Sequence, residues 1–198
     1  MSRKISVSEE IYTHEYLWRA ANLMLEEAKL NEERSIYFFL TANLMFYLSF
    51  EAFINFCGYI LFPEIWQDEK NNFKGKGDVI ESKISKLIEA VTDFEWKKGE
   101  RPYQSIKNLK YFRDIVAHGK VETSHYDVIL KKDGSHIKWI HDWDDFISIE
   151  KVESFGNDIQ SFCQSLLESM RKKSDHPHLI FNAFEGSLAS AEGGPVEK

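Results

Sequence analysis

The feature that most constrains the fold is a long apolar segment, residues 35–62, which carries a single charge, Glu51, and ends at Pro63. A segment of this length and hydrophobicity could cross a lipid bilayer. A membrane span would, however, place Glu51, Asn43 and Asn55 in lipid, and the segment has few basic residues at its ends. We therefore expect a central helix buried in protein and no membrane attachment. A membrane-attached helical protein stays open as the alternative, because periodicity alone does not exclude it.

Four polar residues recur at every fourth position of this segment: Asn43, Tyr47, Glu51 and Asn55. This spacing places them along one slowly rotating face of a helix. A polar stripe on an otherwise apolar helix needs partners, because an unpaired buried polar group is costly. The stripe is therefore the first indication of a site.

The remainder of the chain is also predicted to be mainly helical, since it contains only 10 glycines and 4 prolines in 198 residues. Apolar spacing predicts further helices over residues 11–30, from Asp78 or Ser82 to about 91, over 102–119, and over about 149–170, with a loop over 64–78. The dipeptide Asp133-Gly134 predicts a small β-hairpin insert over about residues 126–141. We expect an all-α, up-down bundle of about five helices within residues 1–175, followed by a mobile tail over 176–198, from which Leu179-Ile180-Phe181 could dock on the bundle.

Composition bears on the cellular compartment and on the distribution of charge. Met1–Glu10 has no apolar run typical of a signal peptide, and Cys57 and Cys163 show neither zinc spacing nor a Cys-x-x-Cys pair. A cytoplasmic protein with reduced, buried thiols is expected. The net charge is −7, yet residues 97–120 contain seven basic and two acidic residues, so this part carries +5.

The basic part includes the segment Tyr111–Gly119, in which four residues separate Arg113 from His118. This arrangement, with the polar Asp114 directly after the arginine, resembles the signature of the HEPN superfamily. The segment Ser49–Asn55 is similar to that family's second-helix pattern, and the resemblance covers roughly residues 10–172.

The resemblance implies a metal-independent endoribonuclease, a toxin or defence effector, in which the ribose 2′-OH attacks the neighbouring phosphate. His118 would act as acid or base, Arg113 would stabilise the anionic transition state, and Asp114, on the same helix face as His118, would orient the imidazole. Glu51 and Asn55 would support the site from the second helix. No metal or cofactor is expected, since the spacing of His136, His141 and Asp142 fits no standard ligand pattern.

The expected partners are RNA and a second copy of the chain. RNA phosphates are expected to contact the residues of the basic face, Lys107, Lys110, Tyr111 and Lys120. The side chains of Arg113 and His118 project about 140° apart on an ideal helix, so one chain alone forms an awkward site unless the helix end unwinds. The HEPN resemblance implies a homodimer that brings two copies of the motif together across a two-fold axis, and we expect the same here. Some HEPN toxins pair with a nucleotidyltransferase-like antitoxin, which adds a regulatory protein as a candidate partner, although no residue of this chain identifies one.

Structural roles for the same residues stay open. Arg113 could form an ion pair with Glu51 that has no chemical role, and Asn55 could be an ordinary interhelical hydrogen-bonding residue. The alternative function is a catalytically inactive HEPN-like dimer that binds RNA, a nucleotide or a protein partner.

Overall fold

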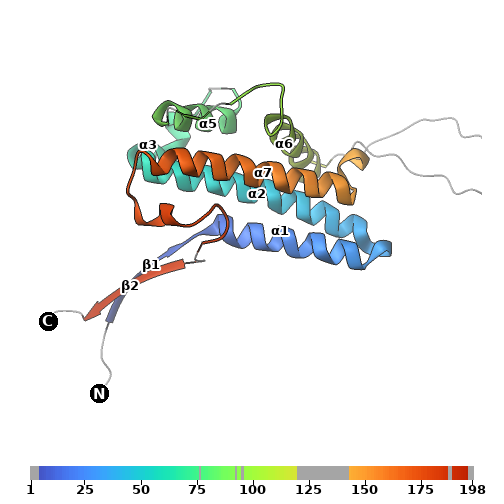
Figure 1. Cartoon of the computed structure of the whole chain (residues 1–198), viewed down its shortest axis with the longest axis horizontal. Coiled ribbons are helices and arrows are strands. Elements are labelled where there is room, and N and C mark those ends of the chain that lie inside the picture. The colour runs from blue at the N-terminus through green and yellow to red at the C-terminus, as the bar shows by residue number, and fades with distance from the viewer. Residues whose placement is uncertain are drawn as a thin grey trace, which may run out of the picture.

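Helix α2 (Ser35–Leu61) lies at the centre of the computed structural model of this chain and packs against all the other long helices (Figure 1). The structure describes residues 5–75, 77–91, 93–94, 96–119, 143–186 and 189–195. The predicted hairpin insert over about 126–141, together with Lys120, lies outside the described residues.

The described residues form an all-α bundle, which confirms the predicted fold class. The other helices are α1 (Thr13–Leu30), α3 (Pro63–Gln67), α4 (Glu69–Asn72), α5 (Val79–Ala90), α6 (Tyr103–Ala117) and α7 (Ile149–Arg171). Single 3-10 turns occur at η1 (Glu32–Arg34), η2 (Asp144–Phe146) and η3 (Pro177–Ile180). Helix α7 lies alongside α2, with α1 on one side of this pair and α5 and α6 on the other (Figure 1).

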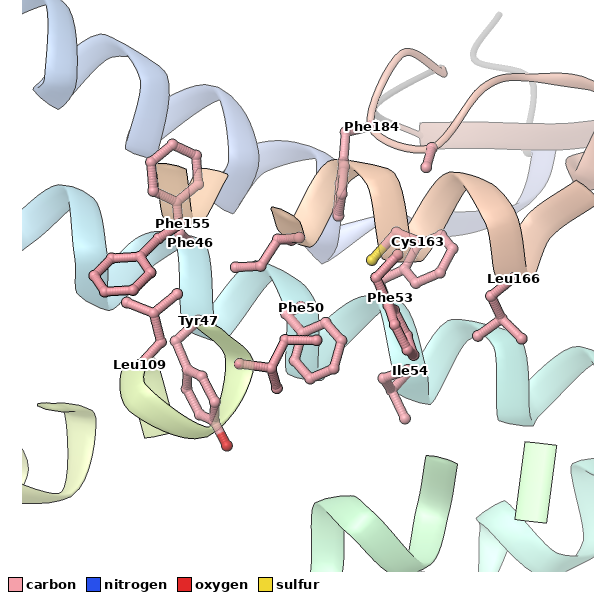
Figure 2. Packing of buried hydrophobic residues seen from close by; sticks show 14 of the residues in the cluster. Phe46, Tyr47, Phe50, Phe53, Ile54, Leu109, Phe155, Cys163, Leu166 and Phe184 are labelled. Carbon is pink, nitrogen blue, oxygen red and sulfur yellow. The ribbon is translucent and has the colours of Figure 1, made fainter. Parts of the chain in front are cut away.

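The core is formed mainly by aromatic residues of α2 that meet α1, α6 and α7 (Figure 2). Phe50 packs edge-to-face on Phe162 of α7, with the ring centroids 5.5 Å apart. Cys57 and Cys163 are free thiols buried in this core, and burial raises the pKa of both well above the ordinary value. The Tyr47 ring lies at the edge of the cluster with its hydroxyl directed out of it (Figure 2). This hydroxyl faces the polar part of the molecule described below.

The predicted loop over residues 64–78 is partly wrong, because α3 and α4 occupy most of it. Pro63 stands in the first turn of α3, where its missing N–H costs nothing. The short helix α3 buries Trp66 against the end of α2. The start of α5 is as predicted: the Asp78 carboxylate accepts hydrogen bonds from the backbone N–H groups of Ile80 and Glu81.

The end of the chain differs from the mobile tail that we expected. Beyond α7 the chain turns back onto the bundle, and Leu179, Ala183 and Phe184 are buried. The Phe184 ring stacks on Trp18 of α1 with a centroid distance of 4.2 Å. The strand β2 (Ala189–Pro195) then pairs antiparallel with β1 (Ile5–Ile11), which brings the two ends of the chain together (Figure 1).

The segment Glu32–Leu61 is long and apolar enough to cross a membrane by length and composition, and 44% of its most apolar window is buried inside the bundle. A helix at the centre of a bundle passes the same test of composition. Helix α2 contacts α1, α5, α6 and α7.

Candidate functional site

The motif identified in the sequence lies at the C-terminal end of α6. The helix ends at Ala117, and His118 is its C-terminal cap, with its backbone N–H donating to the carbonyl of Asp114 at 3.0 Å. The His118 side chain is exposed. The imidazole is therefore accessible to a substrate.

Arg113 lies one and a half turns before His118 and is held by two carboxylates. Its Nη2 is 3.1 Å from Oε1 of Glu51 on α2, and its Nη1 is 2.9 Å from Oδ1 of Asp114. The guanidinium carbon lies 5.2 Å from the centroid of the Tyr47 ring, a cation–π distance. Burial opposes the charge on Arg113, but the carboxylate of Glu51 and the other neighbours outweigh it, so the pKa of Arg113 is raised. The arginine is firmly cationic, and 26% of its side chain is exposed.

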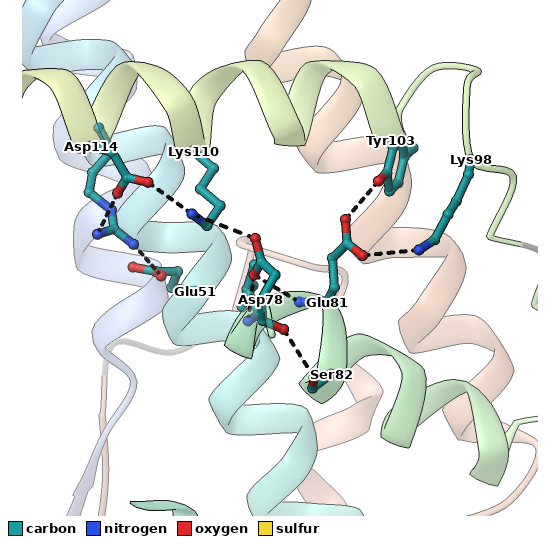
Figure 3. Close-up of polar contacts among 10 residues, drawn as sticks. Glu51, Asp78, Glu81, Ser82, Lys98, Tyr103, Lys110 and Asp114 are labelled. Atoms are coloured by element: carbon teal, nitrogen blue, oxygen red, sulfur yellow. Dashed lines mark hydrogen bonds and ion pairs between the residues drawn. The ribbon is translucent and has the colours of Figure 1, made fainter. Parts of the chain in front are cut away.

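The ion pairs continue from Arg113 to the start of α5 (Figure 3). The second oxygen of Asp114 is 2.8 Å from Nζ of Lys110, which lies 3.5 Å from Oδ2 of Asp78, the capping residue of α5. Hydrogen bonding to Asp114 is the main reason that the pKa of Lys110 is raised. These five residues, Glu51, Arg113, Asp114, Lys110 and Asp78, form a charge network that joins α2, α5 and α6.

Asn43, Glu51 and Asn55 of the polar stripe of α2 have hydrogen-bond or ion-pair partners on other elements of the fold. The Asn43 side chain donates to the carbonyl of Phe146 at 2.8 Å. The Asn55 Oδ1 accepts from Nζ of Lys83 at 2.8 Å and from Nε1 of Trp66 at 3.3 Å. Asn55 thus has the interhelical hydrogen bonds that we weighed as its alternative role, and these bonds direct it toward α3 and α5.

The structure brings together Arg113, Asp114, Glu51 and Lys110, whereas other predicted site residues lie apart. The carboxylate of Asp114 contacts Lys110 and Arg113, so it does not have the expected role of orienting the His118 imidazole. Lys107 is exposed, and Tyr111 is 53% exposed with its ring centroid 6.2 Å from that of Phe146.

Two members of the site were not assigned to it from the sequence. Tyr47 provides the aromatic face beneath Arg113, and its position four residues before Glu51 was the available signal. Asp78 was identified only as a helix cap, yet its second oxygen faces Lys110. Nothing in the local sequence links Asp78 to α6, because this contact depends on how the two helices pack.

The described residues contain no group of three or more His, Cys, Asp or Glu side chains arranged to hold a metal ion. Comparison of the chain with protein-family models, curated proteins and solved structures finds no match. The HEPN resemblance therefore depends on the motif residues and their geometry alone.

Proposed function

We propose that this protein is a metal-independent endoribonuclease of the HEPN type that acts as a homodimer. The observation that carries the proposal is the accessible imidazole of His118, just beyond a cationic Arg113 that Glu51 and Asp114 fix in place. An imidazole that can accept or donate a proton and a fixed guanidinium are groups suited to phosphodiester cleavage by an internal nucleophile.

In the proposed reaction, the ribose 2′-oxygen forms a bond to phosphorus, and the bond from phosphorus to the 5′-oxygen breaks. The products are a 2′,3′-cyclic phosphate and a 5′-hydroxyl end. His118 accepts the 2′-OH proton or donates a proton to the leaving oxygen, and two copies across a dimer could divide these roles. Arg113 offers its planar N–H donors to the pentacoordinate phosphate.

A dimer is proposed because one chain does not bring the imidazole of His118 to the guanidinium of Arg113. The face of α2 next to Glu51 is suited to self-association. Its residues Leu44, Leu48 and Ala52 are only half-buried, and Tyr37 on the first turn is 68% exposed. A two-fold contact on this face would place two charge networks near one another.

The test is incubation of the purified protein with single-stranded RNA in EDTA, followed by analysis of the product ends. We expect Arg113→Ala and His118→Ala each to abolish the cyclic phosphate products while leaving circular dichroism and the sedimentation equilibrium unchanged. Arg34→Ala, an exposed arginine of η1, is the matched control and should cleave as the wild type does. Cleavage that survives in both motif variants would exclude the mechanism, and a strictly monomeric protein at micromolar concentration would exclude the shared site.

The second candidate function is a catalytically inactive dimer that binds RNA, a nucleotide or a protein partner. The observation that favours it is the engagement of Arg113 by two carboxylates, because phosphate has to compete with both. RNA binding without cyclic phosphate ends would support this function and exclude the nuclease.

As a nuclease of this type, the protein would act in the cytoplasm as a toxin or defence effector, controlled by a regulatory or antitoxin protein. Growth arrest on expression of the wild type, but not of His118→Ala, is the expected result in cells. Equal growth of both strains would contradict the toxin role.

A further inference from the structure

A groove of about 450 Å³ lies where β1, the start of α1 and the segment around η3 come together on the C-terminal half of α2 (Figure 1). Its size is that of a small-molecule site. The residues that the argument uses are Glu10, Tyr12, Phe56, Tyr59, His176 and His178. None of them belongs to the charge network of Arg113.

Aromatic rings form much of the wall of the groove. Tyr59 of α2 is 55% exposed, and its ring packs on no other ring of the described residues. The rings of Tyr12 and Phe56 meet edge-to-face at 5.9 Å. A cation held over the face of such a ring is attracted by the ring quadrupole. The tyrosine and phenylalanine rings therefore favour an occupant that is both apolar and positively charged.

A carboxylate is fixed at the edge of the same groove. Oε2 of Glu10 lies 2.9 Å from Nε2 of His178 and accepts a hydrogen bond from the Tyr12 hydroxyl at 3.1 Å. The Tyr12 hydroxyl is also 2.6 Å from Nδ1 of His178. These contacts hold the carboxylate in position, yet 53% of the Glu10 side chain is exposed and open to a ligand.

The groove offers little to an anion. Among the described residues that line it, none is lysine or arginine. Burial lowers the pKa of His14 to about 4, and burial followed by the neighbouring His178 lowers the pKa of His176. Both imidazoles are therefore neutral near pH 7, so a phosphate group would meet the Glu10 carboxylate with no lysine or arginine of the lining to offset it.

We propose that this groove binds an organic cation with a small apolar body, an alkylammonium group held between the aromatic rings and the carboxylate of Glu10. This site is independent of the proposed nuclease activity, because it shares no residue with the motif of α6. The ammonium lies toward Glu10, and its alkyl groups pack against Tyr59 and Phe56.

The experiment is a titration of the full chain with choline, with saturation-transfer difference NMR as the readout. The uncharged isostere 3,3-dimethylbutan-1-ol and uridine are titrated in parallel. For so small a ligand we expect a Kd between about 0.1 and 1 mM. The uncharged isostere should bind at least about tenfold more weakly, since it loses the attraction to the rings and the carboxylate. Equal binding of the isostere, tighter binding of uridine, or no choline binding up to about 10 mM would overturn the proposal.

Two variants locate the site. Tyr59→Ala removes an exposed ring and should weaken choline binding about fivefold or more, and Glu10→Gln should weaken it by a similar factor. Tyr16→Ala is the matched control, since it removes another exposed tyrosine, on α1, that does not line the groove. It should leave the affinity unchanged, whereas unaltered binding in Tyr59→Ala would place the cation elsewhere and overturn the proposal.

Discussion

The buried imidazole of His14 gives a quantitative test of how the two ends of the chain pack. His14 is 5% exposed, and its ring lies 4.7 Å from that of Phe56, 5.6 Å from Phe53 and 6.1 Å from Phe184. Phe53 and Phe56 belong to α2 and Phe184 to the C-terminal segment, so docking of that segment completes this environment. Burial lowers the pKa of His14 from its ordinary value of 6.5 to about 4.

The direction of the pH effect follows from proton binding. Between pH 6.5 and about pH 4 the unfolded chain binds a proton at His14 that the folded chain does not bind. The contribution of His14 is therefore fully present above pH 6.5 and is lost as the pH falls through this window. Linkage gives a loss of about 2 kcal/mol in the free energy of unfolding between pH 7 and pH 5.

The assay is urea denaturation at pH 7 and at pH 5 for the wild type and for His14→Leu, which does not titrate at this position. All other groups contribute in both proteins, including the neighbouring Glu15, whose pKa burial raises. We expect the wild type to lose about 2 kcal/mol more than the variant over this interval. An equal loss in both proteins would show that His14 is solvated, and the docking of Phe184 over it would then be wrong.

Two further expectations concern α2 and can be checked by urea denaturation. A Cβ at Gly58 would lie 1.9 Å from the Trp66 indole. Gly58→Ala should therefore destabilise the protein by about 2 kcal/mol, after allowing for about 1 kcal/mol of gained helix propensity. An unchanged midpoint of urea denaturation would contradict this packing. A double-mutant cycle with Glu51→Gln and Arg113→Gln should give a coupling energy of about 1 to 2 kcal/mol, because roughly three-quarters of each side chain is buried. A coupling energy below about 0.3 kcal/mol would mean that the pair is solvated.

The long helices could be predicted from the sequence because their signals are local. The apolar period of α2, the capping carboxylate of Asp78 and the glycine after His118 each lie within a few residues of the structure that they determine. The polar stripe of α2 also predicted correctly that partners would be found along that helix. An ion pair between Arg113 and Glu51 was one of the alternatives expected from the sequence, and the structure contains this contact.

The ends of the chain could not be predicted in the same way, because their structure depends on contacts between residues more than 150 positions apart. Leu179 begins the short apolar run Leu179-Ile180-Phe181, and Phe184 follows soon after it. So short a cluster has no period from which burial can be inferred. The strand β2 contains alanine, serine and two glycines, residue types that do not favour strands on their own. Its pairing with β1 is a property of the whole fold.

The surface charge around residues 97–120 also depends on contacts between distant residues, and it bears directly on function. A net charge of +5 over residues 97–120 predicts a surface that attracts RNA, yet four of its seven cations have acidic partners from other parts of the fold. Lys98 pairs with Glu81 of α5, and Arg101 pairs with Asp158 of α7 at 2.6 Å.

The charge network of Arg113 is neutralised in the same way, since its three carboxylates and two cations sum to a charge of −1. A sum along the sequence does not detect these partners. Attraction of RNA phosphates at this end of α6 is therefore weaker than the sequence predicts, and an RNA substrate gains the Arg113 guanidinium only by displacing a carboxylate. Under the proposed function, cleavage therefore requires that Glu51 and Asp114 yield that cation to a phosphate.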